Sequence, residues 1–531
     1  MSEAWWRDGV LYQIYPRSYA DSDGDGHGDL PGIRSRLDHL EWLGIDGLWF
    51  NPTMPSPNDD WGYDVADYRG VHPDFGTLDD LDALIADARA RRIRILLDLV
   101  PNHTSDRHPW FAAREHRDFY VWADPAPDGG PPNNWRWAFG GEAWTVDEAS
   151  GQAYLHNFLP SQPDLDWWNE AVREAFDDIL RFWFARGVAG FRLDVAHAIV
   201  KDRGLRDDPV ATAEDHPKVI EHGVRQVHSM NRPEGHDVLR RWRALADADP
   251  GEPRILVGET YVLELDQLPP FYGSGSDELH LAFNFLFVHA ELAAEPLRAI
   301  VERIEAELPA GAWPVWTGSN HDAGRLATRW AQGDEARARV ALMMLLTLRG
   351  TPFLGYGDEI AMMDGAVPKA LARDPVGRRT GDPARGRDGC RTPMQWTAEP
   401  GAGFTAAGVE PWLPIGDAAA RNVADQRADP GSVLHLVRDL IALRRTSADL
   451  TRGTYATLPA PDGAWAWRRG EGLAVALNLS GERVEVDIGE GAVAISTSRA
   501  RDRERVDGPL ALESWEGVVV AGSLTPPRPR G

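Results

Sequence analysis

Short apolar runs, typical of buried β-strands, alternate with longer amphipathic runs, typical of helices, through most of the chain. The apolar runs predict eight strands, at residues 10–16, 47–51, 94–100, 190–196, 254–260, 278–285, 313–320 and 352–359. Strands that alternate with helices form a parallel sheet, and eight such units fit a (β/α)₈ TIM barrel. The sequence therefore predicts an α/β protein built on that barrel.

The amphipathic runs carry helix signals at their ends. The run at residues 31–44 has Pro31 near its start and Gly44 at its end. The run at residues 77–92 begins with Thr77 as the N-cap, with acidic residues early and arginines late, which suits the helix dipole. We expect one helix in each run.

The alternation is interrupted once within the barrel and ends before the C-terminus. Residues 104–167 are rich in Trp, Pro, Gly and Asp and show little periodicity, so they predict an inserted subdomain after the third strand. A last amphipathic helix, at about residues 430–450, precedes short alternating runs such as AWAWRR and LAVALNLS, which predict a small antiparallel β-domain. The expected organisation is a barrel at 1–103 and 168–452, the inserted subdomain at 104–167 and the β-domain at 453–531.

The composition adds limits on partners and location. The 531 residues carry a formal net charge of −26, which repels phosphate backbones and anionic lipid, so neither nucleic acid nor a membrane is an expected partner. Solubility alone also explains such a charge. The single cysteine, Cys390, excludes an internal disulfide, and no charged and apolar leader opens the sequence, so we expect a cytoplasmic enzyme. The oligomeric state, monomer or homodimer, stays open.

Charged and imidazole side chains stand at the carboxyl ends of predicted strands, where (β/α)₈ barrels hold their catalytic groups. They are Asp98, Asn102 and His103, then Arg192 and Asp194, then Glu259, and finally Asn320, His321 and Asp322. Each alone suits a structural role, but together they place carboxylates around one rim. Glycoside hydrolysis needs this arrangement, because one carboxylate attacks the anomeric carbon and another protonates the leaving oxygen. The 22 tryptophans add only a weak preference for carbohydrate.

Five segments, DLVPNH, QPDLDW, GFRLDV, GET and SNHD, follow one another along the chain. In order and approximate spacing they resemble the characteristic segments of the α-amylase family of glycoside hydrolases, in particular its α-glucosidase and oligo-1,6-glucosidase branch. The likeness covers nearly the whole chain. It implies a hydrolase that acts on α-glucosidic bonds, with a small oligosaccharide as its partner and no organic cofactor.

The resemblance implies that three carboxylates carry the chemistry. Asp194 is similar to the nucleophile that forms a β-glucosyl–enzyme ester, and Glu259 to the general acid and base. Asp322 resembles the third carboxylate, which grips the 2- and 3-hydroxyls of the sugar. Arg192 shares the face of Asp194, because side chains two residues apart on a strand point to the same side, and its guanidinium can keep the nucleophile ionised.

Further matched positions imply contacts with the glucose in the −1 subsite. Asp60 and Tyr63, in NDDWGYD, resemble the aspartate at the non-reducing end and the aromatic ring under the sugar. Arg387, in GRDGCRTPMQW, resembles the arginine that pairs with that aspartate, and Arg391 is the alternative. The other expected substrate-binding residues are His103, Phe139, Phe158, Gln162 and His321. Ordinary core packing is the alternative explanation for the two phenylalanines.

An acidic loop, DSDGDGHGD, lies between the first strand and its helix. Asp21, Asp23, Asp25 and Asp29 occupy its first, third, fifth and ninth positions, and His27 would add its backbone carbonyl, as in calcium loops. The glutamate that ends an EF-hand loop is absent. The resemblance implies a structural calcium or magnesium ion at this loop, with an acidic surface turn as the alternative.

The expected activity is that of an exo-acting, retaining α-glucosidase that releases glucose from maltose- or isomaltose-type substrates. A glucosyl transferase or isomerase of the sucrose isomerase or trehalose-forming type is the alternative, because a sugar hydroxyl opens the same glucosyl–enzyme there. A non-enzymatic transporter subunit would carry a membrane helix and often lacks the carboxylates. Val195, directly after the nucleophile, is associated with α-1,6 acceptance in the family, but Ala196 and His197 depart from the pattern of the 1,6-enzymes. Linkage preference therefore stays open.

Overall fold

A parallel β-barrel forms the centre of the computed structural model, which describes residues 4–114, 116–138 and 140–522. Its eight strands are β1 Leu11–Ile14, β2 Gly47–Phe50, β3 Arg94–Leu99, β7 Gly190–Leu193, β8 Ile255–Gly258, β9 Leu281–Ala282, β10 Val315–Thr317 and β11 Thr351–Gly355. Neighbours in the order β10-β11-β1-β2-β3-β7-β8-β9 all pair in parallel. The predicted (β/α)₈ TIM barrel is confirmed.

Large apolar side chains fill the barrel and explain its sequence pattern. Trp49 on β2, Leu96 on β3, Val257 on β8 and Phe353 on β11 belong to one buried cluster that joins strands from different sides of the barrel. Because such strands are covered on both faces, they read as nearly continuous apolar runs. The parallel arrangement brings all their carboxyl ends to one rim.

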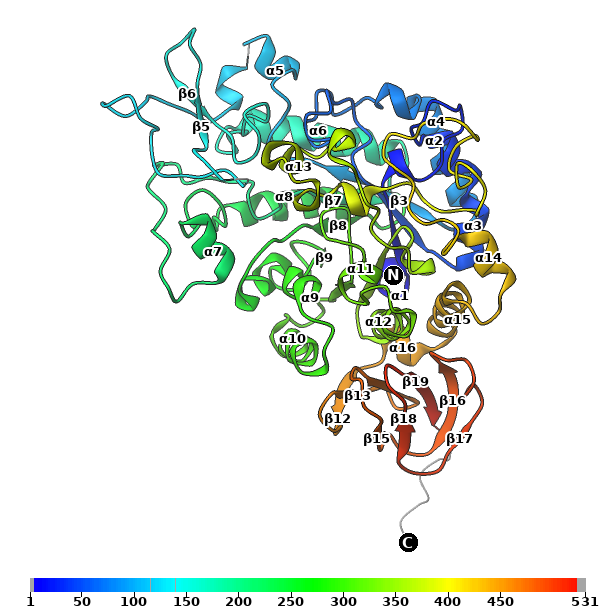
Figure 1. Cartoon of the computed structure of the whole chain (residues 1–531). Helices are drawn as coiled ribbons and strands as arrows, with labels where there is room; N and C mark the ends of the chain where they lie inside the picture. The colour runs from blue at the N-terminus through cyan, green and yellow to red at the C-terminus, as the bar shows by residue number, and fades with distance from the viewer. Residues whose placement is uncertain (1–3, 115, 139, 523–531) are drawn as a thin grey trace.

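Most helices surround the barrel, whereas α5 lies in the insertion (Figure 1). The helices of the described residues are α1 Trp5–Asp8, α2 Leu30–Ser35, α3 Leu37–Leu43, α4 Leu78–Ala90, α5 Pro109–Ala112, α6 Glu170–Ala185, α7 Pro217–His222, α8 Gly235–Ala248, α9 Phe285–His289, α10 Ala294–Glu307, α11 Leu326–Arg329, α12 Glu335–Thr347, α13 Pro375–Thr380, α14 Val423–Ala428, α15 Val433–Thr446 and α16 Ala448–Arg452. None of these described helices is long and apolar enough to cross a membrane.

The helix ends test two of the sequence predictions. Thr77 caps α4 as predicted, in a capping box with Asp80. The prediction of one helix at residues 31–44 is wrong, because Arg36 leaves the helical conformation with φ −104° and ψ 4° between α2 and α3. The Arg36 guanidinium lies over the ring of Trp396 at 4.5 Å, a contact with a distant segment that no local pattern reveals.

The insertion after β3 contains its own antiparallel sheet, at the upper left of Figure 1. The sheet has the order β4-β6-β5, and its strands are β4 Trp122–Ala123, β5 Trp144–Val146 and β6 Ala153–Leu155. Trp135, Trp144 and Leu155 form a small core of their own. The inserted subdomain that the irregular sequence predicts is therefore present.

A buried lysine joins the insertion to the barrel. Lys201, in the segment after β7, is 3% exposed, and its ammonium lies 2.8 Å from Asp164 Oδ2 and also donates to Asn102 Oδ1. Burial lowers the pKa of Lys201, and the charge of Asp164 opposes that shift. Removing the ammonium would leave Asp164 as a buried charge without its cation, which is strongly destabilising.

The described chain ends in the expected antiparallel β-domain, which lies below the barrel in Figure 1. Its larger sheet has the order β12-β13-β14-β19-β16-β17, and β15 pairs with β18. The strands are β12 Tyr455–Leu458, β13 Ala464–Arg469, β14 Leu473–Asn478, β15 Val484–Val486, β16 Gly491–Ser496, β17 Arg505–Val506, β18 Leu510–Leu512 and β19 Gly517–Gly522.

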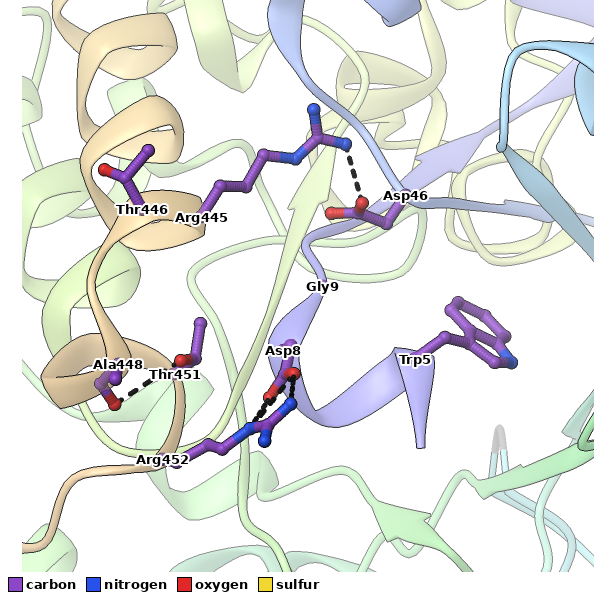
Figure 2. A pocket seen from close by; sticks show the side chains of 9 residues that line it. All are labelled: Trp5, Asp8, Gly9, Asp46, Arg445, Thr446, Ala448, Thr451 and Arg452. Carbon is purple, nitrogen blue, oxygen red and sulfur yellow. Dashed lines mark hydrogen bonds and ion pairs between the residues drawn. The ribbon is translucent and has the colours of Figure 1, made fainter. Parts of the chain in front are cut away.

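A cavity of about 450 Å³ lies at the amino-terminal end of the barrel strands (Figure 2). Asp8 and Gly9, before β1, and Asp46, before β2, line it together with residues of α15 and α16. Arg452 pairs with Asp8 at 2.7 Å, and Arg445 pairs with Asp46 at 2.6 Å. These pairs tie the start of the barrel to the helices before the β-domain, at the end opposite the rim that carries the predicted acids.

Candidate active site

The guanidinium of Arg192 is the centre of a cluster of carboxylates at the carboxyl rim. Arg192, on β7, is 1% exposed, and its Nη1 lies 2.8 Å from Asp98 Oδ1 and 2.8 Å from Asp194 Oδ1. Its Nη2 lies 2.6 Å from Glu259 Oε2. The ends of β3, β7 and β8 thus bring their acids to one cation.

The residue after Asp194 has an unusual backbone conformation. Val195 has a φ of 35°, in the left-handed region that β-branched residues rarely adopt. Its N–H donates to Glu259 Oε2 at 3.0 Å. Strain of this kind persists where the surroundings over-determine it, and here it fixes the Glu259 carboxylate beside the end of β7.

Burial and neighbouring charge act together on the pKa values of these acids. Burial raises the pKa of Asp194 well above its usual value, Arg192 opposes that shift, and Glu259 and Asp98 raise the pKa further. Burial also raises the pKa of Asp98 to about 7, against the attraction of Arg192. One guanidinium therefore does not fully offset Asp194 and Asp98, and the titrations of these two groups are linked.

A hydrogen-bonded chain leads from this cluster to Asp322. The Tyr63 hydroxyl lies 3.0 Å from Asp98 Oδ2 and 2.5 Å from His321 Nε2, and the two rings stack at 5.3 Å. The Gln13 amide lies 2.8 Å from His321 Nδ1, so that nitrogen accepts and Nε2 carries the proton. Nε2 also lies 3.2 Å from Asp322 Oδ2. Burial lowers the pKa of His321 well below its usual value, which keeps the imidazole neutral.

Arg387 joins Asp60 to Asp322. Its Nη2 lies 2.6 Å from Asp60 Oδ1, and its Nη1 lies 3.1 Å from Asp322 Oδ1. Arg391, the alternative partner of Asp60, instead lies 2.8 Å from Asp322 Oδ1. Burial raises the pKa of Asp322, but His321, Arg387 and Arg391 together hold it well below its usual value. The structure thus brings Asp60 to Arg387, and both arginines to Asp322.

Asp374 anchors this pair of arginines, although nothing in the sequence analysis identifies it. Its side chain is fully buried, and its Oδ2 lies 2.5 Å from Arg387 Nε and 3.8 Å from Arg391 Nη1. Its Oδ1 accepts the N–H of Val376 at 2.8 Å and so caps α13. Asp374 lies outside the matched motifs, among other acids of the loop after β11, so the sequence carries no signal that singles it out.

His103 and Gln162 border Asp60 on its other side. Gln162 Nε2 lies 3.4 Å from Asp60 Oδ2 and 3.1 Å from His103 Nε2. Burial lowers the pKa of His103 to about 4, so this imidazole is neutral as well. The Phe158 ring lies 5.1 Å from the ring of His103. Phe139 lies outside the described residues.

The acidic loop between β1 and α2 gathers three of its four aspartates. Oxygens of Asp21, Asp23 and Asp29 all lie within 4.8 Å of one another. Asp25 is not in that group, and its Oδ1 accepts the N–H of His27 at 2.7 Å. Hydrogen bonds also tie Asp21 to the segment that contains Thr405, whose hydroxyl lies 2.5 Å from its Oδ2. The oxygen donors suit a hard cation, and the loop lies apart from the Arg192 cluster.

Comparison with known proteins identifies the class of enzyme. The family profile described as "Alpha amylase, catalytic domain" matches residues 13–453. The chain belongs to the α-amylase family and is a glycoside hydrolase.

Its relatives include both glucosidases and glucosyl transferases. A probable alpha-glucosidase of Rhizobium meliloti (strain 1021) is 43% identical over 467 residues, which cover 85% of this chain and 84% of the relative. An oligo-1,6-glucosidase of Heyndrickxia coagulans is 37% identical over 500 residues, which cover 86% of this chain and 87% of the relative. The crystal structure of an alpha-glucosyl transfer enzyme, XgtA, superposes with a TM-score of 0.90 at 37% identity, covering 98% and 99%. The trehalulose synthase MutB from Pseudomonas mesoacidophila MX-45 superposes with a TM-score of 0.88 at 31% identity, and the match covers 98% of this chain and 100% of MutB.

Asp374→Asn is expected to weaken substrate binding by releasing Arg387. A hydrogen bond between charged groups contributes about 1.5–3 kcal/mol, so we expect kcat/KM to fall by roughly 10-fold or more. The loss should lie mainly in KM, because Arg387 would contact the substrate in its ground state and transition state alike. Steady-state kinetics on maltose measure this split. Asp382→Asn is the matched control, since Asp382 caps η8 Pro383–Arg385 in the same loop and pairs with no arginine among the residues that the structure describes. Equal kinetics of the two variants would contradict the role of Asp374.

Proposed function

We propose that the protein is an exo-acting, retaining α-glucosidase that releases glucose from the non-reducing end of short α-glucosides. The observation that carries the proposal is the buried ion pair between Asp60 and Arg387 beside Asp322. It would face the 4-hydroxyl that ends a glucan chain. In a longer glucan that oxygen carries another sugar, which would clash with the pair and leave both charges poorly solvated, so cleavage inside a chain is disfavoured.

In the first step, Asp194 is the nucleophile and Glu259 the acid. Arg192, in contact with both carboxyl groups, favours the ionised form of Asp194 and fixes its direction. Asp194 forms a bond to the anomeric carbon while Glu259 gives its proton to the glycosidic oxygen, and the bond between that carbon and oxygen breaks. The product is a β-glucosyl ester, with Asp322 and His321 on the sugar hydroxyls.

In the second step, Glu259 is the base. It takes a proton from water, the water oxygen attacks the anomeric carbon, and the ester bond to Asp194 breaks. Two inversions retain the α-configuration of the released glucose. The N–H of Val195 would hold the Glu259 carboxylate in place through both steps.

Glucosyl transfer or isomerisation on the same scaffold is the second candidate. It is favoured by the likeness to the transfer enzyme XgtA and to a trehalulose synthase over almost the whole chain. Both activities share the glucosyl–enzyme and differ only in whether water or a sugar hydroxyl opens it. Free glucose from sucrose supports hydrolysis, whereas a rearranged disaccharide supports isomerisation.

We further propose that the loop of Asp21, Asp23 and Asp29 holds a calcium or magnesium ion with a structural role. Three carboxylates in close proximity repel one another unless a cation balances them. The ion would hold the first β–α connection against the segment that contains Thr405. It takes no part in the proposed reaction.

The first products from maltoheptaose test the exo-acting mode. We expect glucose and maltohexaose together, because the Asp60–Arg387 pair would admit only the terminal glucose. Early maltotriose and maltotetraose would contradict this role of the pair. Arg387→Ala should lower kcat/KM by about 10- to 100-fold, the value of a charged hydrogen bond, without making an efficient endo-enzyme. Chromatography of the earliest time points measures both outcomes.

Asp98→Asn is expected to move the acid limb of the kcat/KM profile to lower pH. Asp194 reacts only as the carboxylate, so kcat/KM falls as the pH decreases through its raised pKa. The negative charge of Asp98 contributes to raising that pKa, and its removal should lower it. Asp59→Asn, at an exposed acid, is the control and should leave the limb in place. An acid limb that moves to higher pH in Asp98→Asn would contradict the linkage.

Removal of the metal should lower the melting temperature more than it lowers kcat in enzyme that is still folded, because a ligand bound only to the native state stabilises it. Two substitutions in the same loop sharpen the test. Asp23→Asn removes a member of the carboxylate group, so EDTA should have little further effect on its melting temperature. Asp25→Asn lies outside the group and should keep the sensitivity to EDTA. A wild-type melting temperature that EDTA does not change, in protein shown to be metal-free, would mean that the loop is only an acidic turn.

A further inference from the structure

Three segments of the rim meet at a group of basic and aromatic side chains beyond Glu259. Lys218 lies near the start of α7, and its Nζ lies 4.9 Å from the ring centre of Tyr261 and donates to the phenol oxygen. The Tyr261 hydroxyl lies 3.3 Å from Nε2 of His289, the last residue of α9. His216 Nδ1 accepts the backbone N–H of Lys218 at 3.2 Å, and the charges of His216 and Arg329 act on His289. We call Lys218, Tyr261, His289, His216 and Arg329 the basic cluster.

The basic cluster is next to Glu259 and on the half of the barrel away from Asp60. The Tyr261 N–H donates to His197 Nδ1 at 3.3 Å, and the same Nδ1 lies 3.4 Å from the carbonyl oxygen of Glu259. The basic cluster follows strands on one side of the barrel, with Lys218 after β7, Tyr261 after β8 and His289 after β9. Asp60 follows β2, and Arg387, with which it pairs, follows β11. In the sheet order, β11, β1 and β2 form one side and β7, β8 and β9 the other.

The basic cluster lies on the side of Glu259 where the leaving group of the substrate would bind. In the proposed function, on which this inference rests, the glucose lies between Asp60 and Asp194, and Glu259 protonates the oxygen that links it to the leaving group. Groups on the far side of Glu259 therefore face the leaving group. Lys218 is exposed, which leaves its ammonium accessible from solvent.

The cations of the basic cluster have no directly paired carboxylate, although the charges of Asp358 and Asp364 act on Arg329 from beyond ion-pair distance. In residues 4–114, 116–138 and 140–522, no carboxylate oxygen lies within 4.0 Å of a side-chain nitrogen of Lys218, His216, His289 or Arg329. Asp215, beside His216 in sequence, is paired with Arg225 at 2.7 Å. Burial and the positive charges of Lys218, Arg329 and His216 lower the pKa of His289 to about 4. His289 is therefore uncharged at neutral pH, and the positive charge of the basic cluster rests with Lys218 and Arg329 rather than with His289.

A structural role alone would explain part of this arrangement, since Lys218 holds the segment of α7 against Tyr261. A latch of that kind needs only the hydrogen bond to the phenol oxygen. It does not need three further basic side chains, His216, His289 and Arg329, beside it. An ammonium also has three protons, of which the phenol accepts one, so the others remain for a ligand.

We propose that the basic cluster makes this enzyme prefer α-glucosides whose leaving group carries an anionic group, a carboxylate or a phosphate, over neutral α-glucosides of the same size. Lys218 is the specificity-determining residue, because it is exposed and directly beside Tyr261. The anion would replace the missing counter-charge. It would also be attracted to a positive site within a protein whose net charge repels anions elsewhere.

Matched pairs of substrates test the proposal on the full-length enzyme. Maltobionate and maltitol share the same linkage and an open-chain leaving group, and differ in a carboxylate against a hydroxymethyl group. α-Glucosylglycerol with and without a phosphate on the glycerol forms the second pair and separates phosphate from carboxylate. We expect kcat/KM for the anionic substrate to exceed that for the neutral substrate by about 5- to 10-fold in at least one pair at low ionic strength. This ratio corresponds to the free energy of one partly exposed charge pair. The ratio should fall toward one at about 0.5 M salt, where the Debye length is short.

Substitutions of lysine identify the group responsible. Lys218→Met should bring the ratio close to one, and Lys218→Arg, which keeps the charge, should retain most of it. Lys369→Met is the matched control, because Lys369 is an exposed lysine in the loop after β11, on the other side of the barrel, and it should not change the ratio.

Two outcomes would overturn the proposal. One is a wild-type ratio of one or less in both pairs. The other is an unchanged ratio in Lys218→Met, and if both substrates lose activity equally there, the lysine is only a latch. Glucose release from maltose is measured in parallel. An enzyme active on maltose with a ratio of one overturns this inference alone, whereas an enzyme inactive on maltose overturns the proposed function with it.

Discussion

One buried guanidinium must balance the carboxylates of three strands, and the arrangement of the rim depends on this constraint. Arg192 lies opposite Asp98 in the register of β3 and β7, and its other nitrogen reaches Glu259 from β8. Without the arginine, these acids could not ionise together in a buried site. Without the acids, the arginine would be a buried charge without a partner. The strands must therefore end at matched heights, which is a condition on the whole barrel and not only on the site.

A second group of charges lies beside the first and has more cations for its acids, because Arg387 and Arg391 lie among three carboxylates, those of Asp60, Asp322 and Asp374. Arg387 and Arg391 form ion pairs with both Asp322 and Asp374, and they help to hold the pKa of Asp322 below its usual value. Around Arg192 the acids are in excess, and the pKa of Asp194 is raised. Two neighbouring carboxyl groups are thus pushed in opposite directions by their surroundings. Such a separation of pKa values allows chemically identical groups to take different roles in one site.

The sequence predicted the fold well because buried parallel strands leave a pattern that needs no knowledge of their neighbours. The break at Arg36 escaped prediction, since no local pattern marks it, and the Arg36 guanidinium lies against Trp396, far away in the chain. For the candidate site, the strand-end acids stand out in the sequence, and likeness to a family brings Asp60 and Arg387 together across 327 residues. Asp374 has neither signal, because its importance comes only from the two arginines that it touches. Local patterns predict helices and strands, but they do not reveal which distant side chains form ion pairs with one another.

The pairing of β1, the first strand of the barrel, with β11, its last strand, has a consequence while the chain is being synthesised. β1 lies between β2 and β11, with Leu11 opposite Phe353, and the N–H of Asp21 donates to Phe404 O at 2.8 Å. While the chain emerges from the ribosome, one edge of β1 has no partner until β11 has been made. The growing barrel is therefore an open sheet with an unsatisfied edge during most of translation. Such an edge is a site for pairing with other chains, so protection of the nascent chain matters more for this enzyme than its compact native structure suggests.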